Sequence, residues 1–398
     1  METIRLLTFS TLYPNNARPN HGIFVENRLR HLIASRHAHS VVVAPVPWFP
    51  SRSPRFGDWA RHAGVVPSEV RHGIEVHHPR YPVIPRVGMS AAPYLLYRAM
   101  LPALRRLLAS GQRFDAIDAH YFYPDGVAAV WLGRALGLPT VVTARGTDVN
   151  LIPRHLVPRV LIRQAIAGAT ALVTVSAALK DALVALGAPQ EKVTVLRNGV
   201  DTSLFRPVDR DVARSELGLT RPTLLSVGHL IERKGHHRVV EAMPRLPEFD
   251  LLIVGEGPQR GQLVGLIDRL GLAGRVRLLG ARPHTELPSL YGAADVLVLA
   301  SSREGWANVL LEAMACGTPV VASNIWGNPE VVRDAAAGLI ADENTPDGIV
   351  AAVRRLFTHL PERAATRAYA EQFSWDATTD GQLALFRSLC SVRRSAPV

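Results

Sequence analysis

Short apolar runs alternate with helical patterns through almost the whole chain, and this alternation constrains the fold more than any other sequence feature. In the first 200 residues, the runs that read as buried strands are Ile4–Ser10, Ser40–Pro45, Ala116–Ala119, Thr140–Ala144, Ala171–Val175 and Val193–Leu196. Helical patterns separate them, at Ile23–Ser35, Pro93–Leu108 and Val127–Leu136. Alternation at this spacing predicts an α/β fold, with parallel sheets covered by helices.

The pattern pauses near Asn198-Gly199, a turn dipeptide, and the polar stretch Asp209–Ser215 has the composition of a linker. A second series of strand-like runs follows, at Thr223–Val227, Leu251–Val254, Val276–Leu279, Val296–Leu299 and Val320–Ala322. We therefore expect two Rossmann-like, doubly wound domains, residues 1–198 and 199–375, and a last helix over 376–398. Ligands of open α/β sheets bind beyond the carboxyl ends of the strands, so an interdomain cleft is the expected site.

Positive charge is concentrated in the first half of the chain. Residues 1–200 hold 23 Lys and Arg against 11 Asp and Glu, and the remainder holds 22 against 23, so the formal net charge of +11 comes from the first half. This asymmetry predicts an anionic partner, either a membrane surface or a phosphorylated acceptor, although a solvated Arg-rich surface is an alternative. Nucleic acid is disfavoured because no zinc-finger spacing or aromatic RNA-binding signature accompanies the charge.

The chain has no apolar window long enough for a transmembrane helix, and its first residues do not read as a signal peptide. We expect a cytoplasmic protein, with a peripheral position on the inner face of the cytoplasmic membrane as an open question. Cys316 and Cys390 match no metal-ligand spacing, and Asp209-Arg210-Asp211 spells a metal-binding D-x-D only within the expected linker. No metal and no cofactor are therefore expected.

The segment Ala300–Pro319 carries the sharpest local signal. It follows a predicted strand, turns at Glu304-Gly305 and enters a helix that ends before Gly317. If the residues from Glu304 to Glu312 were helical, the two acids would stand about 12 Å apart along the helix axis. Glycosidase carboxylates stand only about 5–9.5 Å apart. The spacing favours two acids that hold separate hydroxyls of one extended ligand, or else two solvated acids.

Two glycine-containing loops follow other predicted strands of the second domain. In Val227–Gly235, Lys234 or Arg233 could neutralise a diphosphate leaving group without a metal. In Val254–Pro258, the glycine spacing departs from the dinucleotide fingerprint, which disfavours a nicotinamide oxidoreductase. An ordinary basic loop and a turn made for packing are the alternatives.

The first domain offers candidates at three predicted strand ends. Gly22 lies in the loop after the first strand, where a glycine allows a phosphate to approach the backbone. His120 closes an apolar run, and Arg145 and Asp148 follow the next one, which offers a cation and a carboxylate on the acceptor side. A turn glycine, a structural histidine and a structural ion pair are the alternatives.

Aromatic and basic residues interleave before the first long helix of this domain. Trp48, Phe56 and Trp59 alternate with Arg52, Arg55 and Arg61 in the same stretch. This combination suits a membrane interface, although a packed loop cluster is the alternative.

In their order along the chain, the motifs resemble glycosyltransferase family 4, the retaining transferases with the GT-B fold. The resemblance covers nearly the whole chain and is closest to bacterial enzymes for exopolysaccharide or teichuronic-acid-type synthesis. The residues that carry it are Asn198–Asp201 with Phe205, Val227–Gly235, Val254–Pro258, Glu304–Glu312 and Gly317–Val321.

This resemblance implies roles for individual residues. Glu304 would contact the transferred sugar, Glu312 the ribose and Lys234 the diphosphate, and His120 would lie near the reacting sugar, so that His120, Glu304 and Lys234 are the catalytic candidates. The other implied donor contacts are Gly22, His229, Arg233, Gly255, Gly257, Gly305, Trp306, Ala307, Asn308 and Val309. The final helix would cross back to the first domain.

Three departures from the family pattern affect specificity. His229 stands where Arg is usual, Thr143–Asp148 carries Arg145 where the family has His, and Trp306-Ala307 replaces Phe-Gly after Glu304-Gly305. The predicted function is retaining transfer from a UDP- or GDP-sugar to a lipid-linked or polysaccharide acceptor in bacterial surface or exopolysaccharide synthesis. The alternatives are a sugar-nucleotide epimerase of the same fold and a non-catalytic protein that binds anionic lipid.

Overall fold

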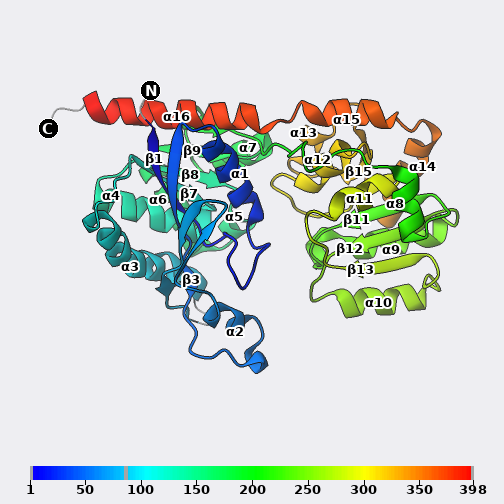
Figure 1. The fold of residues 1–398 in the computed structure, drawn as a ribbon, viewed down its shortest axis with the longest axis horizontal. Helices are drawn as coiled ribbons and strands as arrows, with labels where there is room; N and C mark the ends of the chain where they lie inside the picture. The colour runs from blue at the N-terminus through cyan, green and yellow to red at the C-terminus, as the bar shows by residue number, and fades with distance from the viewer. Residues whose placement is uncertain (1–2, 85–87, 396–398) are drawn as a thin grey trace. The chain divides into compact units, whose positions relative to one another are not determined.

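The computed structural model describes residues 3–84 and 88–395, and the chain divides into two compact units (Figure 1). Unit 1 comprises Met1–Arg197 and Asp376–Val398, and unit 2 comprises Asn198–Trp375. These boundaries lie within one residue of those expected from the sequence. Both units are α/β, with parallel sheets covered by helices, as the alternation predicted.

Within the described residues, unit 1 is built on an eight-stranded sheet with the order β10-β9-β8-β7-β1-β2-β5-β4. Neighbouring strands are parallel except for the antiparallel pair β4 and β5. The central strands are buried along almost their whole length because helices cover both faces of the sheet. The strands are β1 (Ile4–Phe9), β2 (Ala38–Val43), β4 (Ser68–Arg71), β5 (Ile74–His77), β7 (Ala116–His120), β8 (Thr140–Ala144), β9 (Ala171–Thr174) and β10 (Val193–Val195).

Helices of unit 1 cover the two faces of this sheet, and a short pair of strands, β3 (Val46–Pro47) and β6 (Arg80–Tyr81), forms a separate sheet near α2 (Figure 1). Leu383 and Phe386 of α16 belong to the same apolar core as Leu6 and Leu29, so the last helix packs onto the unit that begins the chain. The helices are α1 (Ile23–Ala34), α2 (Asp58–Ala63), α3 (Gly88–Ala109), α4 (Val127–Leu136), α5 (Thr147–Asn150), α6 (Leu156–Gly168), α7 (Ala177–Ala185) and α16 (Trp375–Ser395).

In unit 2, the described strands form a six-stranded parallel sheet with the order β13-β12-β11-β14-β15-β16. Numbered within the unit, this order is 3-2-1-4-5-6, the order of a Rossmann sheet. The sequence missed β16, whose run is short and begins with a glycine. The strands are β11 (Thr223–Val227), β12 (Asp250–Val254), β13 (Val276–Gly280), β14 (Val296–Leu299), β15 (Val320–Ser323) and β16 (Gly338–Ala341).

The helices of unit 2 cover both faces of its sheet, and helices α14 and α9 pack against one side of the apolar core. They are α8 (Arg210–Leu217), α9 (His236–Ala242), α10 (Arg260–Arg269), α11 (Leu287–Ala293), α12 (Asn308–Ala315), α13 (Asn328–Val331), α14 (Pro346–Thr358) and α15 (Arg363–Glu371). In the part of the chain that the structure describes, no helix combines the length and the apolar character needed to cross a membrane.

The expected linker at residues 209–215 is in fact helix α8, and the prediction was wrong there. The Asp209 carboxyl caps the helix by accepting hydrogen bonds from the backbone N–H groups of Asp211 and Val212, both at 3.1 Å. Arg214 lies 3.3 Å from the Asp295 carboxylate, and Arg210 pairs with the same group. The polar composition that suggested a linker is that of a surface helix held by charges.

We predict that Asp209→Ala weakens the start of α8 by about 1 kcal/mol, because an alanine cannot accept the capping hydrogen bonds. Hydrogen exchange of the backbone amides of α8 should then speed up about fivefold. Asp209→Ser keeps a capping oxygen and should exchange at close to the wild-type rate. Equal exchange in all three proteins would show that the cap does not hold the helix.

Candidate functional site

The main sheet of each unit has one point at which the strand order reverses, and Lys234, Glu304 and His120 lie at or after the carboxyl ends of the strands beside it. In unit 2 this point lies between β11 and β14, and in unit 1 it lies between β1 and β7. Crossover connections leave such neighbouring strands in opposite directions, which opens a crevice where ligands bind. The strand order alone thus selects the loops after β11 and β14, and those after β1 and β7.

In unit 2, Lys234 and Glu304 meet at this point. Lys234 follows β11, and its Nζ lies 2.6 Å from Oε1 of Glu304, in the loop after β14. The Ser301 hydroxyl donates to the same oxygen at 2.8 Å, and Arg233 Nη1 lies 3.9 Å from Oε2. Burial by itself would raise the pKa of the Glu304 carboxyl, but Lys234, with Arg233 and Ser301, holds that pKa below its ordinary value. The site therefore contains an ionised carboxylate beside a lysine.

A glycine lets these two loops approach each other. Gly235 has φ of +71°, and a Cβ there would lie 2.0 Å from the Ala300 carbonyl oxygen. Any larger residue would push the turn after Lys234 away from the loop that carries Glu304. The ion pair thus depends on the missing side chain at Gly235.

Glu312 binds a different group of residues. The Tyr291 hydroxyl donates to Glu312 Oε2 at 2.8 Å, and His284 Nε2 lies 3.4 Å from Oε1. The ring of Phe205 packs edge-on against His284 with centroids 4.9 Å apart. Burial would lower the pKa of His284, but the hydrogen bond and the charge of Glu312 raise it above its ordinary value.

The helical spacing assumed between Glu304 and Glu312 was wrong, because helix α12 begins only at Asn308. Glu304 lies in the loop before the helix, with Gly305, Trp306 and Ala307 buried beside it. The N-cap residue Ala307 has no side chain to bind the first backbone N–H groups, and the first turn contains no acid. The positive end of α12 therefore faces the loop without a capping carboxylate, which suits an anionic or hydroxyl-rich ligand.

The remaining donor candidates of unit 2 differ in their surroundings. His229 is exposed in the turn after β11, and the side chains of Asn308 and Val309 are half-buried at the start of α12. A Cβ at Gly255 would lie 1.9 Å from the Gly228 carbonyl oxygen, and one at Gly257 would lie 2.5 Å from that of Leu230. Packing of the two turns accounts for both glycines, and their contact with a ligand stays a prediction.

Sequence reasoning missed four residues of this site: Ser301, Tyr291, His284 and His236. His236 Nδ1 lies 2.9 Å from the Ser226 hydroxyl, and burial, with the charge of Lys234, lowers the pKa of His236 to about 4. Its imidazole is therefore neutral near pH 7. Tyr291 and His284 stand 21 and 28 residues before Glu312, so no local pattern connects them to it.

In unit 1, His120 closes β7 and is buried between two charged side chains. Its Nε2 lies 3.2 Å from Asp118 Oδ2, and Arg145 Nη2 lies 2.7 Å from its Nδ1. Because a guanidinium can only donate, Nδ1 accepts and the ring proton sits on Nε2, toward Asp118. Burial, with the charge of Arg145, lowers the pKa of His120, so the ring is neutral.

Arg145 and Asp148 do not form the ion pair that the sequence left open. The Asp148 carboxyl accepts hydrogen bonds from the backbone N–H groups of Phe122, Arg145 and Gly146, between 2.6 and 3.1 Å. It therefore holds together the loops after β7 and β8. The Arg145 guanidinium instead points to His120 and lies over the Phe24 ring, 5.4 Å from its centroid.

The loop after β1 contributes groups that the sequence did not single out. The Asp125 carboxyl accepts from the backbone N–H of Thr11 at 2.6 Å and from the Thr11 hydroxyl at 2.9 Å. Burial raises the pKa of Asp125 to about 7. Gly22 precedes α1 with φ of +69°, and a Cβ there would lie 2.3 Å from the Leu12 carbonyl oxygen. Packing alone therefore requires a glycine at position 22, and contact of Gly22 with a phosphate stays a prediction.

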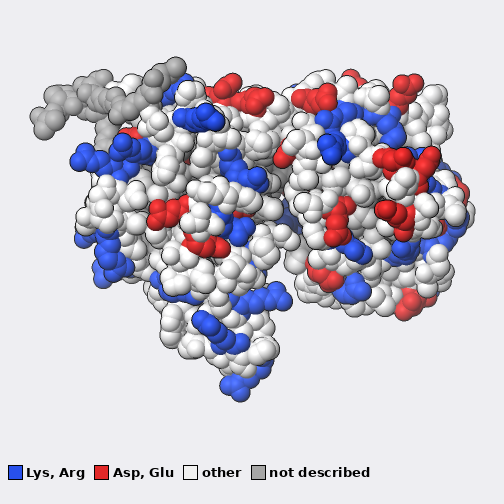
Figure 2. Space-filling model, in the orientation of Figure 1, with Lys and Arg blue, Asp and Glu red and all other residues white. Residues whose placement is uncertain are grey.

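The surface of unit 1 carries exposed arginines, and the side-chain clusters can be examined for a metal site. Figure 2 shows Lys and Arg side chains gathered over the segment around α2 of unit 1, where Arg52, Arg55 and Arg61 are exposed. Among residues 3–84 and 88–395, no cluster of His, Cys, Asp and Glu side chains is arranged to hold a metal ion.

Residues 22–204 match the family described as glycosyltransferase family 4, and residues 208–373 match that described as glycosyl transferases group 1. D-inositol 3-phosphate glycosyltransferase 1 of Catenulispora acidiphila is 33% identical, over 83% of this chain and 84% of its own length. The enzyme of that description from Segniliparus rotundus is 36% identical, but the chain spans only about half of its length.

Solved structures show the same fold. Sucrose-phosphate synthase from Thermosynechococcus elongatus superposes with a TM-score of 0.77 at 21% identity, over 98% of this chain and 100% of that one. Anabaena HepE in complex with UDP-glucose superposes with a TM-score of 0.72 at 20% identity, over 97% and 99%. The fold is that of GT-B glycosyltransferases, as the resemblance implied. The curated relatives carry the name of an inositol-phosphate transferase rather than of an exopolysaccharide enzyme.

We predict that the pKa of His284 falls when Glu312 is replaced by Gln, because the carboxylate that favours the imidazolium is lost. Because folding raises the pKa of His284, its pairing with Glu312 adds to the free energy of unfolding at pH values below the ordinary histidine pKa of about 6.5. This contribution is lost as the pH rises through the pKa of His284 in the folded protein. Histidine NMR titration between about pH 5 and pH 8 measures this directly. His237 serves as the internal control, and an unchanged His284 pKa in Glu312→Gln would contradict the assignment.

Proposed function

Because the chain belongs to glycosyltransferase family 4, we propose that it moves a sugar from a UDP- or GDP-sugar to a lipid-linked or polysaccharide acceptor, with retained anomeric configuration. The observation that carries the proposal is the ion pair between the half-buried Lys234 and the buried Glu304 at the strand-order switch of unit 2. An ionised acid, a cation and an uncapped helix start meet there, and each matches a different part of a nucleotide-sugar.

The diphosphate of the donor is the part with the clearest partners. Lys234 and the N-terminus of α12 both offer positive charge. A further cation, Arg233, lies 3.9 Å from the Glu304 carboxylate that Lys234 also contacts. These groups can stabilise the charge that develops on the leaving nucleotide, which requires no bound metal. His229 is exposed in the turn after β11 and adds a further polar group there.

We assign Glu304 to the hydroxyls of the transferred sugar and Glu312 to those of the ribose. Glu304 is ionised because Lys234 lowers the pKa of its carboxyl. Its carboxylate can therefore accept hydrogen bonds from the hydroxyls of the transferred sugar. Glu312, held by Tyr291 and His284, can accept from ribose hydroxyls. Since both acids are assigned to donor hydroxyls, we propose that the leaving diphosphate accepts the proton of the acceptor hydroxyl, as the bond from the sugar to the diphosphate breaks and the bond from the sugar to the acceptor oxygen forms.

The acceptor is assigned to unit 1. His120, Arg145 and the loop after β1 lie at the switch point of its sheet, and we propose that the acceptor hydroxyl binds there. Because His120 is buried and neutral, we assign it a role in shaping the site and accepting a hydrogen bond from Arg145. The exposed arginines near α2 suit an anionic acceptor or a membrane surface, and a place at the cytoplasmic face of the membrane is part of this proposal.

A second candidate acceptor is an inositol phosphate. It is favoured by the relative from Catenulispora acidiphila, which is named for that substrate and is 33% identical over 84% of its length. A lipid phosphate and an inositol phosphate are both anionic, so the exposed arginines of unit 1 suit either. A sugar-nucleotide epimerase of the same fold would differ from both because it would act without any acceptor.

The donor is identified by thermal-shift screening against UDP-, GDP- and ADP-sugars, and HepE, a structural neighbour, was crystallised with UDP-glucose. The stabilising sugar is then incubated with the protein and either inositol phosphate or a prenyl phosphate sugar. Retained configuration in the NMR spectrum of the product supports the proposal. Epimerised donor in the absence of acceptor, or stabilisation by none of the nucleotide-sugars, contradicts it.

We predict that Glu304→Gln and Lys234→Ala each lower kcat/KM on the order of 100-fold or more, because each removes a charge that contacts the reacting donor. Circular dichroism should show that both variants remain folded. The matched controls Glu241→Gln and Arg269→Ala change exposed residues of α9 and α10 and should keep wild-type turnover. Near-normal turnover in both site variants is the result that would overturn the assignment.

A further inference from the structure

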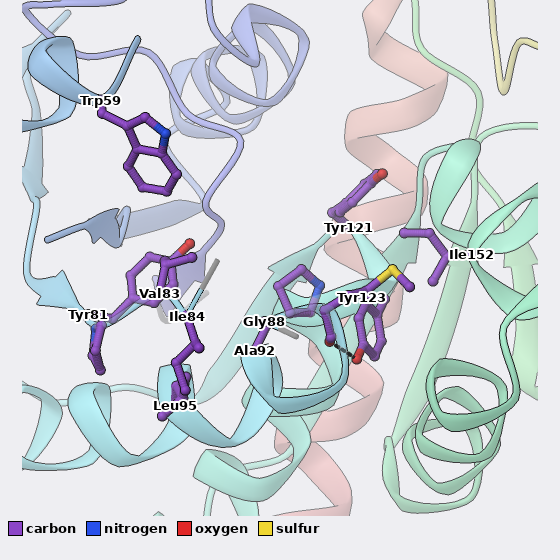
Figure 3. Close-up of a pocket in the computed structure, with 13 residues that line it drawn as sticks. Trp59, Tyr81, Val83, Ile84, Gly88, Ala92, Leu95, Tyr121, Tyr123 and Ile152 are labelled. Atoms are coloured by element: carbon purple, nitrogen blue, oxygen red, sulfur yellow. Dashed lines mark hydrogen bonds between the residues drawn. The ribbon is translucent and has the colours of Figure 1, made fainter. Parts of the chain in front are cut away.

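Unit 1 contains an apolar cavity of about 560 Å³, within the range of about 300–1,000 Å³ for small-molecule sites. Figure 3 shows the rings of Trp59, Tyr81, Tyr121 and Tyr123 around it, with Ile84 and Ile152 among the aliphatic side chains. Among the residues that the structure describes, which do not include 85–87, no charged side chain lines it. The cavity is therefore suited to a hydrocarbon rather than to a sugar.

The cavity lies at the end of β7, beside the acceptor candidates. Its residues Tyr121, Tyr123 and Pro124 follow directly after His120, the last residue of that strand. The Tyr123 hydroxyl donates to the carbonyl oxygen of Met89 on α3, as the dashed line in Figure 3 shows. This hydrogen bond satisfies the polar atom of the tyrosine, so its ring presents only an apolar surface.

The mouth of the cavity exposes large apolar side chains to solvent. Trp59, Ile84 and Met89 line it with exposed fractions of 39%, 45% and 43%. Three large apolar side chains exposed around one cavity suit an apolar ligand. Arg52 and Arg55 are exposed on the segment that leads to Trp59, so positive charge lies close along the chain to one wall of the cavity.

We propose that this cavity binds the hydrocarbon chain of the acceptor, and that Arg52 and Arg55 face the phosphate of the same molecule. This inference rests on the proposed function and narrows its acceptor to an amphiphile with an alkyl or prenyl chain. A sugar or an inositol carries more hydroxyls than the few polar atoms of the described lining can bind, and each buried hydroxyl left without a partner costs roughly 1–3 kcal/mol. The apolar lining therefore distinguishes the two acceptors that the family likeness leaves open.

The test is calorimetric titration of the full-length protein with alkyl phosphates from methyl to dodecyl, each below its micelle concentration. The dissociation constant should fall about fourfold for each added CH₂ until the cavity is full. Monomeric ligands report on the cavity and not on a membrane surface. A dissociation constant that does not change with chain length would overturn the inference.

Ala92 lines the cavity from α3, and Ala92→Phe should fill part of it. This variant should bind dodecyl phosphate at least tenfold more weakly while its melting temperature stays near that of the wild type. Arg98→Phe introduces the same ring at an exposed position of the same helix and should bind as the wild type does. Ile84→Asn, at the exposed mouth, provides a second variant that adds a polar group without bulk.

Equal losses in Ala92→Phe and Arg98→Phe would contradict the assignment to the cavity. Donor binding is measured in parallel, since the donor residues belong to unit 2. If nucleotide-sugars bind and alkyl phosphates do not, this inference fails and the proposed function stands. If alkyl phosphates bind in the cavity and no nucleotide-sugar binds, the proposed function fails.

Discussion

The adjacency of β11 and β14 is the constraint on which the candidate donor site depends. It brings together Lys234 and Glu304, 70 residues apart in sequence, and Gly235 removes the side chain that would keep their loops apart. A partly buried ion pair of this kind is weak evidence for stability, because removing the Glu304 charge from water offsets much of the attraction between the two groups. Its position at a strand-order switch makes a role in binding the better explanation.

Unit 1 repeats the same geometry with different chemistry. At its switch point the buried His120 lies between Asp118 and Arg145, and the Asp148 carboxyl accepts hydrogen bonds from backbone N–H groups. These groups shape the loops, and the open surface nearby is apolar rather than charged. One unit thus offers ionised groups, and the other offers an apolar cavity with exposed arginines on a neighbouring segment of the chain. This division matches a transferase that joins a nucleotide-sugar to an amphiphile.

Local sequence patterns were sufficient for many of the elements. Strands β8, β11 and β14 and helix α4 have the predicted bounds, because a buried parallel strand is a continuous apolar run and its flanking helix has a clear period. Helix α8 was mistaken for a linker, since its stabilising contacts with Asp295 lie more than 80 residues away. The short strands β3, β4, β5 and β6 were missed because runs of two to four residues carry little periodicity.

The sequence by itself determined the α/β class, the division near residue 198 and the placing of Glu304, Lys234 and His120 at strand ends. These follow from composition and period along the chain, which are local properties. Only the tertiary structure decided which strand ends are neighbours, and hence that Glu304 binds Lys234 while Glu312 binds Tyr291 and His284. It also decided that the start of α3 and the residues after β6 and β7 enclose an apolar cavity. Strand order and cavity walls join residues that are far apart in sequence, and no local pattern records such contacts.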